Sequence, residues 1–328
     1  MTSPRRRRSH AQRNLRDRRF GSADLLDLLD LLDLLDLLDA PGPGPAVISP
    51  RVRADASQAR RGAAARQGEG RVERIVASAG LLYQLYERRL VRSLDRDGVP
   101  RHVGVILDGN RRWAKGLGAP VAHGHRRGAD KISELLHWSE EAGVEVVTLW
   151  MLSTDNLQRD PAEVAELLGI IAAAVDKIAD TGRHGLRVVG SLDLLPDDVA
   201  ARLRDAEART AGRRGLQVNV AIGYGGRHEI TDAVRALLRE RAAAGQSIED
   251  VAAEIGVDDI TAHLYTKGQP DPDLVIRTSG EQRLGGFLLW QSVHSEYYFC
   301  EVYWPDFRRV DFLRALRDYA QRERRHGR

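Results

Sequence analysis

The 328-residue sequence predicts an α/β domain with a mostly parallel central sheet flanked by helices. Two observations carry this prediction. Apolar residues make up 42% of the chain, which is enough for a sizeable core. Short apolar runs also alternate with longer stretches in which apolar residues recur at helical spacing, a pattern typical of βαβ units.

The expected elements follow one another regularly along the chain. Strands are expected at 102–108, 144–152, 186–189, 216–222 and 273–276, and helices at 128–142, 161–179, 197–208, 227–242 and 311–322. Gly143 ends the first of these helices and Pro161 begins the second. Before the first strand, Leu81, Leu82, Leu85, Tyr86 and Leu90 recur at helical spacing. This amphipathic helix either packs against the body or caps an entrance to it, and packing is favoured.

The first 72 residues are different from the rest. Arg5–Arg8 open an arginine-rich stretch, and Asp24–Asp39 is a Leu-Leu-Asp repeat. Aspartate at every third position spirals around a helix and leaves no apolar stripe, and it also denies a secretory signal its apolar core. We expect a disordered, low-complexity segment at 1–72, or alternatively an arm that binds a partner or nucleic acid, and a folded domain at 73–328.

Charge and cysteine content exclude several classes of protein. Residues 1–72 carry a net charge of +5, from 14 Arg and nine acidic residues, whereas 73–328 carry −2, so no nucleic acid is expected to bind the body. Cys300 is the single cysteine, which excludes a disulfide framework and a cysteine-rich zinc site. The apolar runs are much shorter than the roughly 18 residues that a membrane span needs. We expect a cytoplasmic protein, at most peripherally associated with a membrane.

Three polar clusters follow expected strands, where ligands of open parallel sheets bind. The first is Asp108–Ala114, in which Gly109 permits a sharp turn and arginines accompany a carboxylate. A carboxylate beside an anion site makes sense where Mg²⁺ bridges it to a diphosphate, although an ordinary helix cap with surface arginines is the alternative. The second cluster is Ser153–Arg159, which also fits a helix cap, and the third is Arg277–Arg283, with Glu296 further on.

Together these clusters resemble the cis-prenyltransferase (undecaprenyl diphosphate synthase) family. Four blocks, 108–114, 153–159, 223–230 and 273–296, occur in the family's order and spacing, and the match runs from about Leu81 to the C-terminus. The chain is most similar to actinobacterial short-chain members that make Z,E-farnesyl diphosphate. The resemblance implies a single domain that contains a hydrophobic tunnel. It also implies that the protein works as a homodimer.

The resemblance also implies the catalytic residues. Asp108 would hold Mg²⁺ and assist departure of the allylic diphosphate, and Glu296 would complete the metal site, from across a dimer or from the same subunit. Asn156, with Ser153 nearby, would position isopentenyl diphosphate and help remove its proton. Metal and arginine would supply the charge neutralisation that allylic cation chemistry requires.

Substrate contacts are implied by the same blocks. The allylic diphosphate would be bound by Gly109, Asn110, Arg111, Arg112, Trp113 and His125. Isopentenyl diphosphate would be bound by Arg277 and Arg283, with further substrate contacts from Ser153, Thr154, Asp155, Arg159, Leu284 and Gly285. The ending Arg325-His326-Gly327 resembles a family ending that reaches a neighbouring subunit's site.

Several positions depart from the family pattern. The substituted positions are Val121 for Arg, Asp155 for Glu, Leu157 for Trp, Gly285 for Ser and His294 for Tyr. Val121 and Gly285 each remove a possible diphosphate contact. His123 has no match in the pattern and is expected to be a solvated loop residue.

The resemblance therefore implies condensation of isopentenyl diphosphate with a short allylic diphosphate, geranyl diphosphate being favoured, to give (2Z,6E)-farnesyl diphosphate. Met151 lies where many long-chain members carry a small residue, so its side chain would block elongation; alternatively it is core, and the helix from Pro161 limits the tunnel. Other readings are a long-chain synthase or a non-catalytic partner subunit. The presence of Asp108, Arg112 and Asn156 argues against the latter.

Overall fold

The computed structural model describes residues 85–92, 94 and 98–322. The expectations for 1–72, for Leu81 and Leu82, and for 325–327 lie outside these residues. Six strands form one all-parallel sheet in the order β3-β4-β2-β1-β5-β6. The strands are β1 (His102–Ile106), β2 (Val146–Ser153), β3 (Gly185–Val189), β4 (Gln217–Tyr224), β5 (Leu274–Arg277) and β6 (Glu296–Phe299).

Eight α-helices accompany the sheet in the main body of the described chain. They are α5 (Asn110–Gly116), α6 (Val121–Ala142), α7 (Pro161–Asp180), α8 (Asp197–Arg209), α9 (Gly226–Ala243), α10 (Ile248–Glu254), α11 (Val257–Thr261) and α12 (Arg309–Gln321). Short 3₁₀ helices lie at η3 (Asp155–Gln158), η4 (Leu192–Leu194), η5 (Gln291–His294) and η6 (Trp304–Asp306). No helix in the described ranges is both long and apolar enough to span a membrane.

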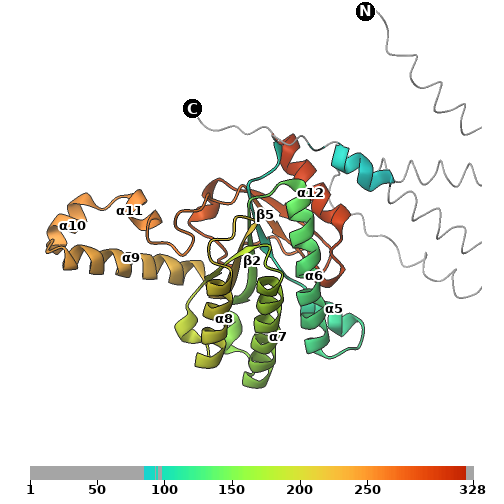
Figure 1. Ribbon diagram of the computed structural model, residues 1–328, viewed down its shortest axis with the longest axis horizontal. Coiled ribbons are helices and arrows are strands. Elements are labelled where there is room, and N and C mark those ends of the chain that lie inside the picture. The colour runs from blue at the N-terminus through green and yellow to red at the C-terminus, as the bar shows by residue number, and fades with distance from the viewer. Residues whose placement is uncertain (1–84, 93, 95–97, 323–328) are drawn as a thin grey trace, which may run out of the picture. The chain divides into compact units, whose positions relative to one another are not determined.

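The main core lies between one face of the sheet and a layer of helices. Figure 1 shows α6, α7 and α8 side by side, and contacts with α12 extend the layer. Alternate strand residues such as Val105, Leu149 and Val220 face this layer and are fully buried. They pack against helix residues such as Leu135 and Leu203. Because burying each such side chain stabilises by about 1.5–3 kcal/mol, this layer holds the strand ends at fixed positions.

The opposite face of the sheet carries a smaller apolar cluster and a buried polar network. Phe287 and Leu288, from the loop after β5, cover Ile106 and Val275. Towards the amino ends of the strands, Thr148 lies between His102 and Asn219. The Nε2 atom of His102 is 2.8 Å from the Thr148 hydroxyl, and the Asn219 amide donates to that hydroxyl at 2.9 Å.

This network fixes the protonation state of His102. Its Nδ1 lies 2.7 Å from the carbonyl oxygen of Pro270, an acceptor only, so Nδ1 carries the proton and Nε2 accepts from Thr148. Burial lowers the pKa of His102 to about 4, so the ring is neutral at pH 7. Through Pro270 the ring ties the loop before β5 to the centre of the sheet.

The expected strands and helices are found in their order, with one substantial correction at α6. We expected this helix to begin at Gly128, but it begins at Val121. Its glycines are packing residues rather than helix breakers, since a Cβ at Gly124 would lie 2.2 Å from the Asn110 carbonyl oxygen, and one at Gly128 would lie 2.3 Å from Asn110 Oδ1. His123 is consequently helical, not in a loop, and stacks on Trp113 with ring centroids 5.6 Å apart.

Of the remaining elements, the helix before the first strand was predicted and three others were not. Residues 85–92 are helical, and Tyr86 and Leu90 pack against Val310 and Leu313 of α12, so the packing interpretation of this helix is confirmed. β6, α10 and α11 were not predicted. Figure 1 shows α9 extending away from the sheet with α10 and α11 beside it.

Candidate active site

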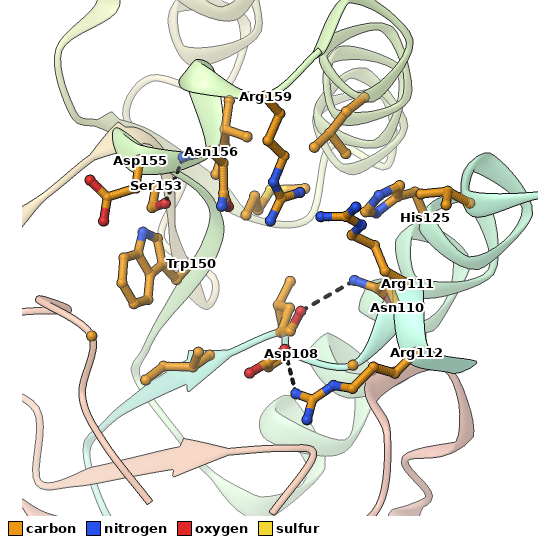
Figure 2. Close-up of a pocket in the computed structure, with 18 of the residues that line it drawn as sticks. Asp108, Asn110, Arg111, Arg112, His125, Trp150, Ser153, Asp155, Asn156 and Arg159 are labelled. Atoms are coloured by element: carbon orange, nitrogen blue, oxygen red, sulfur yellow. Dashed lines mark hydrogen bonds and ion pairs between the residues drawn. The ribbon is translucent and has the colours of Figure 1, made fainter. Parts of the chain in front are cut away.

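The candidate site lies at the carboxyl ends of three neighbouring strands. β1 has β2 on one side and β5 on the other, so the segments that follow these strands converge. They line a pocket of about 840 Å³ together with α5 and the start of α6. Figure 2 shows Asp108, Arg111, Arg159 and Asn156 arranged around this space.

Asp108 is held by residues that are distant in the sequence. Its backbone N–H donates to the Thr278 hydroxyl at 3.0 Å, and that hydroxyl donates to the Asp108 carbonyl oxygen at 2.7 Å. Arg112 Nη2 donates to Asp108 Oδ1 at 3.2 Å, and Arg277 Nη2 donates to Oδ2 at 2.8 Å. Burial alone would raise the pKa of Asp108, but the hydrogen bond and charge of Arg277, the Ser279 hydroxyl and the charge of Arg112 together outweigh it and lower the pKa. Asp108 is therefore a carboxylate at neutral pH.

Gly109 makes the turn from β1 into α5 possible. Its φ of 108° lies in the left-handed region, and a Cβ there would be 2.7 Å from Tyr303 Cδ1. A larger residue would be both strained and in collision with Tyr303. Gly109 thus sets the direction in which the arginines of α5 leave the strand.

The pocket carries a strong excess of positive charge. Six basic side chains line it, namely Arg111, Arg112, Lys115, Arg159, Arg277 and Arg283, against the two carboxylates Asp108 and Asp155. Arg111 and Arg159 share one carboxylate, Glu163, at 3.6 Å and 3.4 Å. Burial lowers the pKa of Arg159, and the neighbouring Arg111 lowers it further. Two guanidiniums with a single counter-charge make a favourable site for a multiply charged anion.

Several buried donors of the pocket have no hydrogen-bond partner in the described part of the chain. They are Nε1 of Trp150 and Nε of Arg277, and Nε2 of His125 is a further buried nitrogen without a partner, which is a donor when it bears the ring proton. Burial, followed by the charge of Arg159, lowers the pKa of His125, so its ring is neutral at pH 7. Trp150 is held by stacking on Phe287, with ring centroids 5.2 Å apart. Buried donors are seldom left unpaired in proteins, so these groups suit a ligand rich in acceptor oxygens.

The segment after β2 supplies polar groups beside an apolar wall. The pairing of β2 with β4 is irregular between Trp150 and Ser153, so the strand's alternation is broken there. The Asn156 N–H donates to Ser153 Oγ at 3.1 Å, which orders the turn. Met151 and Leu152 line the pocket together with Leu167 of α7. One cavity therefore joins cationic and apolar surfaces.

The structure brings most of the predicted site residues together. Those that line the pocket are Asp108, Gly109, Asn110, Arg111, Arg112, His125, Ser153, Asp155, Asn156, Arg159, Arg277, Arg283 and Gly285. Those that do not are Trp113, Thr154, Leu284 and Glu296. Trp113 faces His123, and Leu284 packs with the apolar cluster around Phe287.

Glu296 lies apart from Asp108 in this chain. It begins β6 opposite Leu274, at the amino end of β5, whereas Asp108 follows the carboxyl end of β1. Its carboxylate is paired with Arg322. Among the described residues, no three His, Cys, Asp or Glu side chains form a cluster that could hold a metal ion. The described part of the chain therefore does not place Glu296 beside Asp108.

Sequence analysis missed Lys115 and the groups that hold the site. Lys115 lines the pocket from α5, and its position four residues after Arg111, on the same helical face, was an available signal. The roles of Thr278, Ser279 and Glu281 had no comparable signal, because they contact Asp108 or Arg112 across more than 160 residues of sequence.

Comparison with known proteins identifies the class of enzyme. The model of the undecaprenyl diphosphate synthase family matches residues 106–327, and the chain belongs to this family of isoprenyl transferases. The resemblance seen in the sequence is confirmed. The fold agrees as well: lavandulyl diphosphate synthase from Lavandula x intermedia, solved in complex with dimethylallyl diphosphate, is 31% identical with a TM-score of 0.66, covering 71% of this chain and 100% of that one.

Two relatives within this family are similar to the chain over nearly their whole length. A (2Z,6E)-farnesyl diphosphate synthase of Thermobifida fusca is 60% identical over 248 residues, which cover 75% of this chain and 97% of the relative. A short-chain Z-isoprenyl diphosphate synthase of Mycobacterium leprae is 55% identical over 250 residues, which cover 75% of this chain and 95% of the relative.

Proposed function

We propose that the protein condenses isopentenyl diphosphate with a short allylic diphosphate, geranyl diphosphate being preferred, to give (2Z,6E)-farnesyl diphosphate. The observation that carries the proposal is the pocket in which six basic side chains adjoin the apolar wall of Met151, Leu152 and Leu167. The names of the relatives support a short product. In the reaction the allylic C1–O bond breaks, C4 of isopentenyl diphosphate bonds to C1, and a proton leaves C2.

The allylic diphosphate lies against Asn110, Arg111, Arg112 and His125 in this proposal. Arg111 and Arg112 neutralise charge that grows on the leaving oxygen as the C1–O bond breaks. The neutral His125 ring donates a hydrogen bond through whichever nitrogen bears the proton. Because these groups are already held in place by the fold, little reorganisation accompanies bond breaking.

A magnesium ion fits this site through Asp108. Mg²⁺ is commonly bound by one or two protein carboxylates together with substrate phosphates and waters. Each Asp108 oxygen accepts one hydrogen bond from an arginine and keeps a lone pair for a metal. When bound, the ion would neutralise the diphosphate charge and so assist its departure. Asp108 would hold the ion, and Arg112 and Arg277 keep the carboxylate ionised and oriented.

Isopentenyl diphosphate lies towards β5, between Arg277 and Arg283 on one side and Ser153 and Asn156 on the other. An amide is too weak a base to take the C2 proton, so we assign Asn156 to orienting the substrate. The released diphosphate is the stronger base in the same pocket and takes the proton.

A homodimer is part of the proposal. A second copy would bring its own Glu296 towards the Asp108 of the first, which one chain does not do by itself. The reading as a non-catalytic subunit is less favoured, because the pocket contains Asp108, Asn156 and the cationic residues together.

The length of the product tests whether the apolar wall limits chain elongation. Met151 packs against the main core and lines the pocket, so Met151→Ala should enlarge the space available to the growing chain. With labelled isopentenyl diphosphate and geranyl diphosphate, we expect the wild type to release mainly a C15 product and Met151→Ala a longer distribution.

Leu192→Ala is the matched control, because Leu192 packs against the same core but does not line the pocket. This control should keep the wild-type product length. Release of chains of fifty carbons or more by the wild type would instead establish the long-chain reading.

A further inference from the structure

Ser279 has a backbone conformation that normally favours glycine. Its φ is 81°, and the next residue, Gly280, has φ 74°. A glycine adopts such a conformation at 280 without strain, but Ser279 is not a glycine. A side chain in the left-handed region is disfavoured, because its Cβ comes too close to the following carbonyl oxygen. The segment 300–302 imposes this conformation, because the N–H groups of Ser279 and Gly280 donate to the carbonyls of Val302 and Cys300 at 2.8 Å and 2.9 Å.

The strained residue contacts the catalytic pocket through its hydroxyl. Ser279 Oγ accepts a hydrogen bond from Arg112 Nη2 at 2.7 Å. The same nitrogen donates to Asp108 at 3.2 Å, and Nη1 donates to Glu281 at 3.0 Å. The contact with Ser279 is therefore the shortest hydrogen bond of this guanidinium, and Ser279 itself is only 8% exposed.

These contacts fix the plane of the Arg112 guanidinium. Two acceptors, Ser279 and Asp108, meet at one nitrogen, and the ring of Tyr303 lies under the group at 5.6 Å. Figure 2 shows Arg112 reaching from α5 to Asp108, across the floor of the pocket. A long arginine side chain would otherwise sample many rotamers, and holding it in advance removes that entropy from the binding step.

We propose that Ser279 is a positioning residue, whose strained backbone aims its hydroxyl so that Arg112 meets the allylic diphosphate in a fixed orientation. The assignment of this ligand to Arg112 rests on the proposed function. Strain that persists beside a functional side chain is expected when the strained group itself contributes to function. Glycine would avoid the strain but has no hydroxyl to offer.

Two variants separate strain from contact. Ser279→Gly loses both the hydroxyl and the strain, whereas Ser279→Ala loses the hydroxyl and keeps the strain. We expect each to lower kcat/KM for the allylic substrate about 10-fold, the lower end of the effect of a hydrogen bond to a charged group, with KM for isopentenyl diphosphate unchanged. Ser279→Gly should melt several degrees higher than Ser279→Ala.

Ser139→Ala is the matched control, since it removes a buried hydroxyl that bonds only the Leu135 carbonyl within α6. It should leave kcat/KM unchanged. Full activity in Ser279→Gly, or an equal rise of KM for both substrates, would overturn the proposal.

Binding of inorganic diphosphate, measured by calorimetry, keeps this inference separable from the proposed function. Affinity should fall about 10-fold in both Ser279 variants and remain unchanged in Ser139→Ala. If the wild type did not turn over allylic diphosphates, the proposed function would fail, and calorimetry would still decide whether Ser279 orients Arg112 toward a diphosphate. Unaltered affinity in both variants would reject the role of Ser279.

Discussion

Asp108 shows how a single side chain is prepared for its role by distant residues. Thr278 fixes its backbone, and Arg112 and Arg277 fix its carboxylate. Arg277 is buried, so removing the carboxylate altogether would leave a buried guanidinium without its counter-charge. Asparagine keeps the shape and an acceptor oxygen, and it is therefore the better probe of charge at this position.

Asp108→Asn should lower kcat by 10³-fold or more while the circular dichroism spectrum stays native. A loss of this size corresponds to about 4 kcal/mol of transition-state stabilisation, the upper part of the range for one essential electrostatic group. Steady-state kinetics at saturating Mg²⁺ measure it. Asp130→Asn on the exposed face of α6 should be silent. Substantial Mg²⁺-dependent turnover in Asp108→Asn would contradict the role of this carboxylate.

Mixing two inactive variants then tests the homodimer. If Glu296 acts across a dimer, subunits with Asp108→Asn and subunits with Glu296→Gln should regain activity when mixed, because one of the two sites in each mixed dimer is intact. If Glu296 acted only within its own chain, no mixture would be active.

At the scale of elements, the buried network around Thr148 links β1, β2 and the loop before β5. His102 is its titratable member, and its pKa of about 4 lies well below the ordinary value of 6.5. Below pH 6.5 the unfolded chain gains a proton that the folded ring does not. The contribution of the neutral His102 ring to the free energy of unfolding is therefore complete above pH 6.5 and is lost as the pH falls towards 4.

His102→Gln should flatten the pH dependence of stability between pH 6.5 and 4. The wild-type contribution over this window is at most about 3 kcal/mol, from the size of the pKa change. Urea unfolding at pH 7.5, 5.5 and 4.5 measures it, with His137→Gln on the exposed face of α6 as control. If the free energy of unfolding fell equally with pH in the wild type and in His102→Gln, this role of His102 would be refuted.

Element order was predictable from the sequence, whereas some boundaries were not. Val105 and Leu149 lie in short apolar runs, and such runs between amphipathic helices specify a parallel sheet. The start of α6 was mispredicted because the close approach of Asn110 to Gly124 is a tertiary contact that periodicity does not contain. For the same reason the pocket residues that adjoin strand ends were found, but the positioning role of Thr278 was missed.

The whole molecule divides, in our interpretation, into a catalytic domain and the segment 1–72. The family match begins at residue 106, and the helix at 85–92 already packs on α12 through Tyr86 and Leu90. We therefore expect the catalytic domain to include residues before the matched region. Its N-terminal boundary is testable by truncation.

Deletion of residues 1–72 should leave turnover within about two-fold and the melting temperature nearly unchanged, since changes away from the core usually alter stability by less than about 0.5 kcal/mol. Deletion of residues 1–92 is the contrasting variant. It removes Tyr86 and Leu90, exposes Val310 and Leu313 and should lower the melting temperature by several degrees. A 1–72 deletion that fails to fold would show that the boundary is misplaced.

The central claim is the formation of a short Z-configured product, and product identity for the wild type tests it most directly. Full-length protein would be incubated with Mg²⁺, labelled isopentenyl diphosphate and geranyl diphosphate, and the dephosphorylated products separated by chromatography against (2Z,6E)- and (2E,6E)-farnesol standards. We predict one dominant product that co-migrates with (2Z,6E)-farnesol. A dominant product with an E double bond at the new position, or a ladder reaching fifty carbons, would contradict the account.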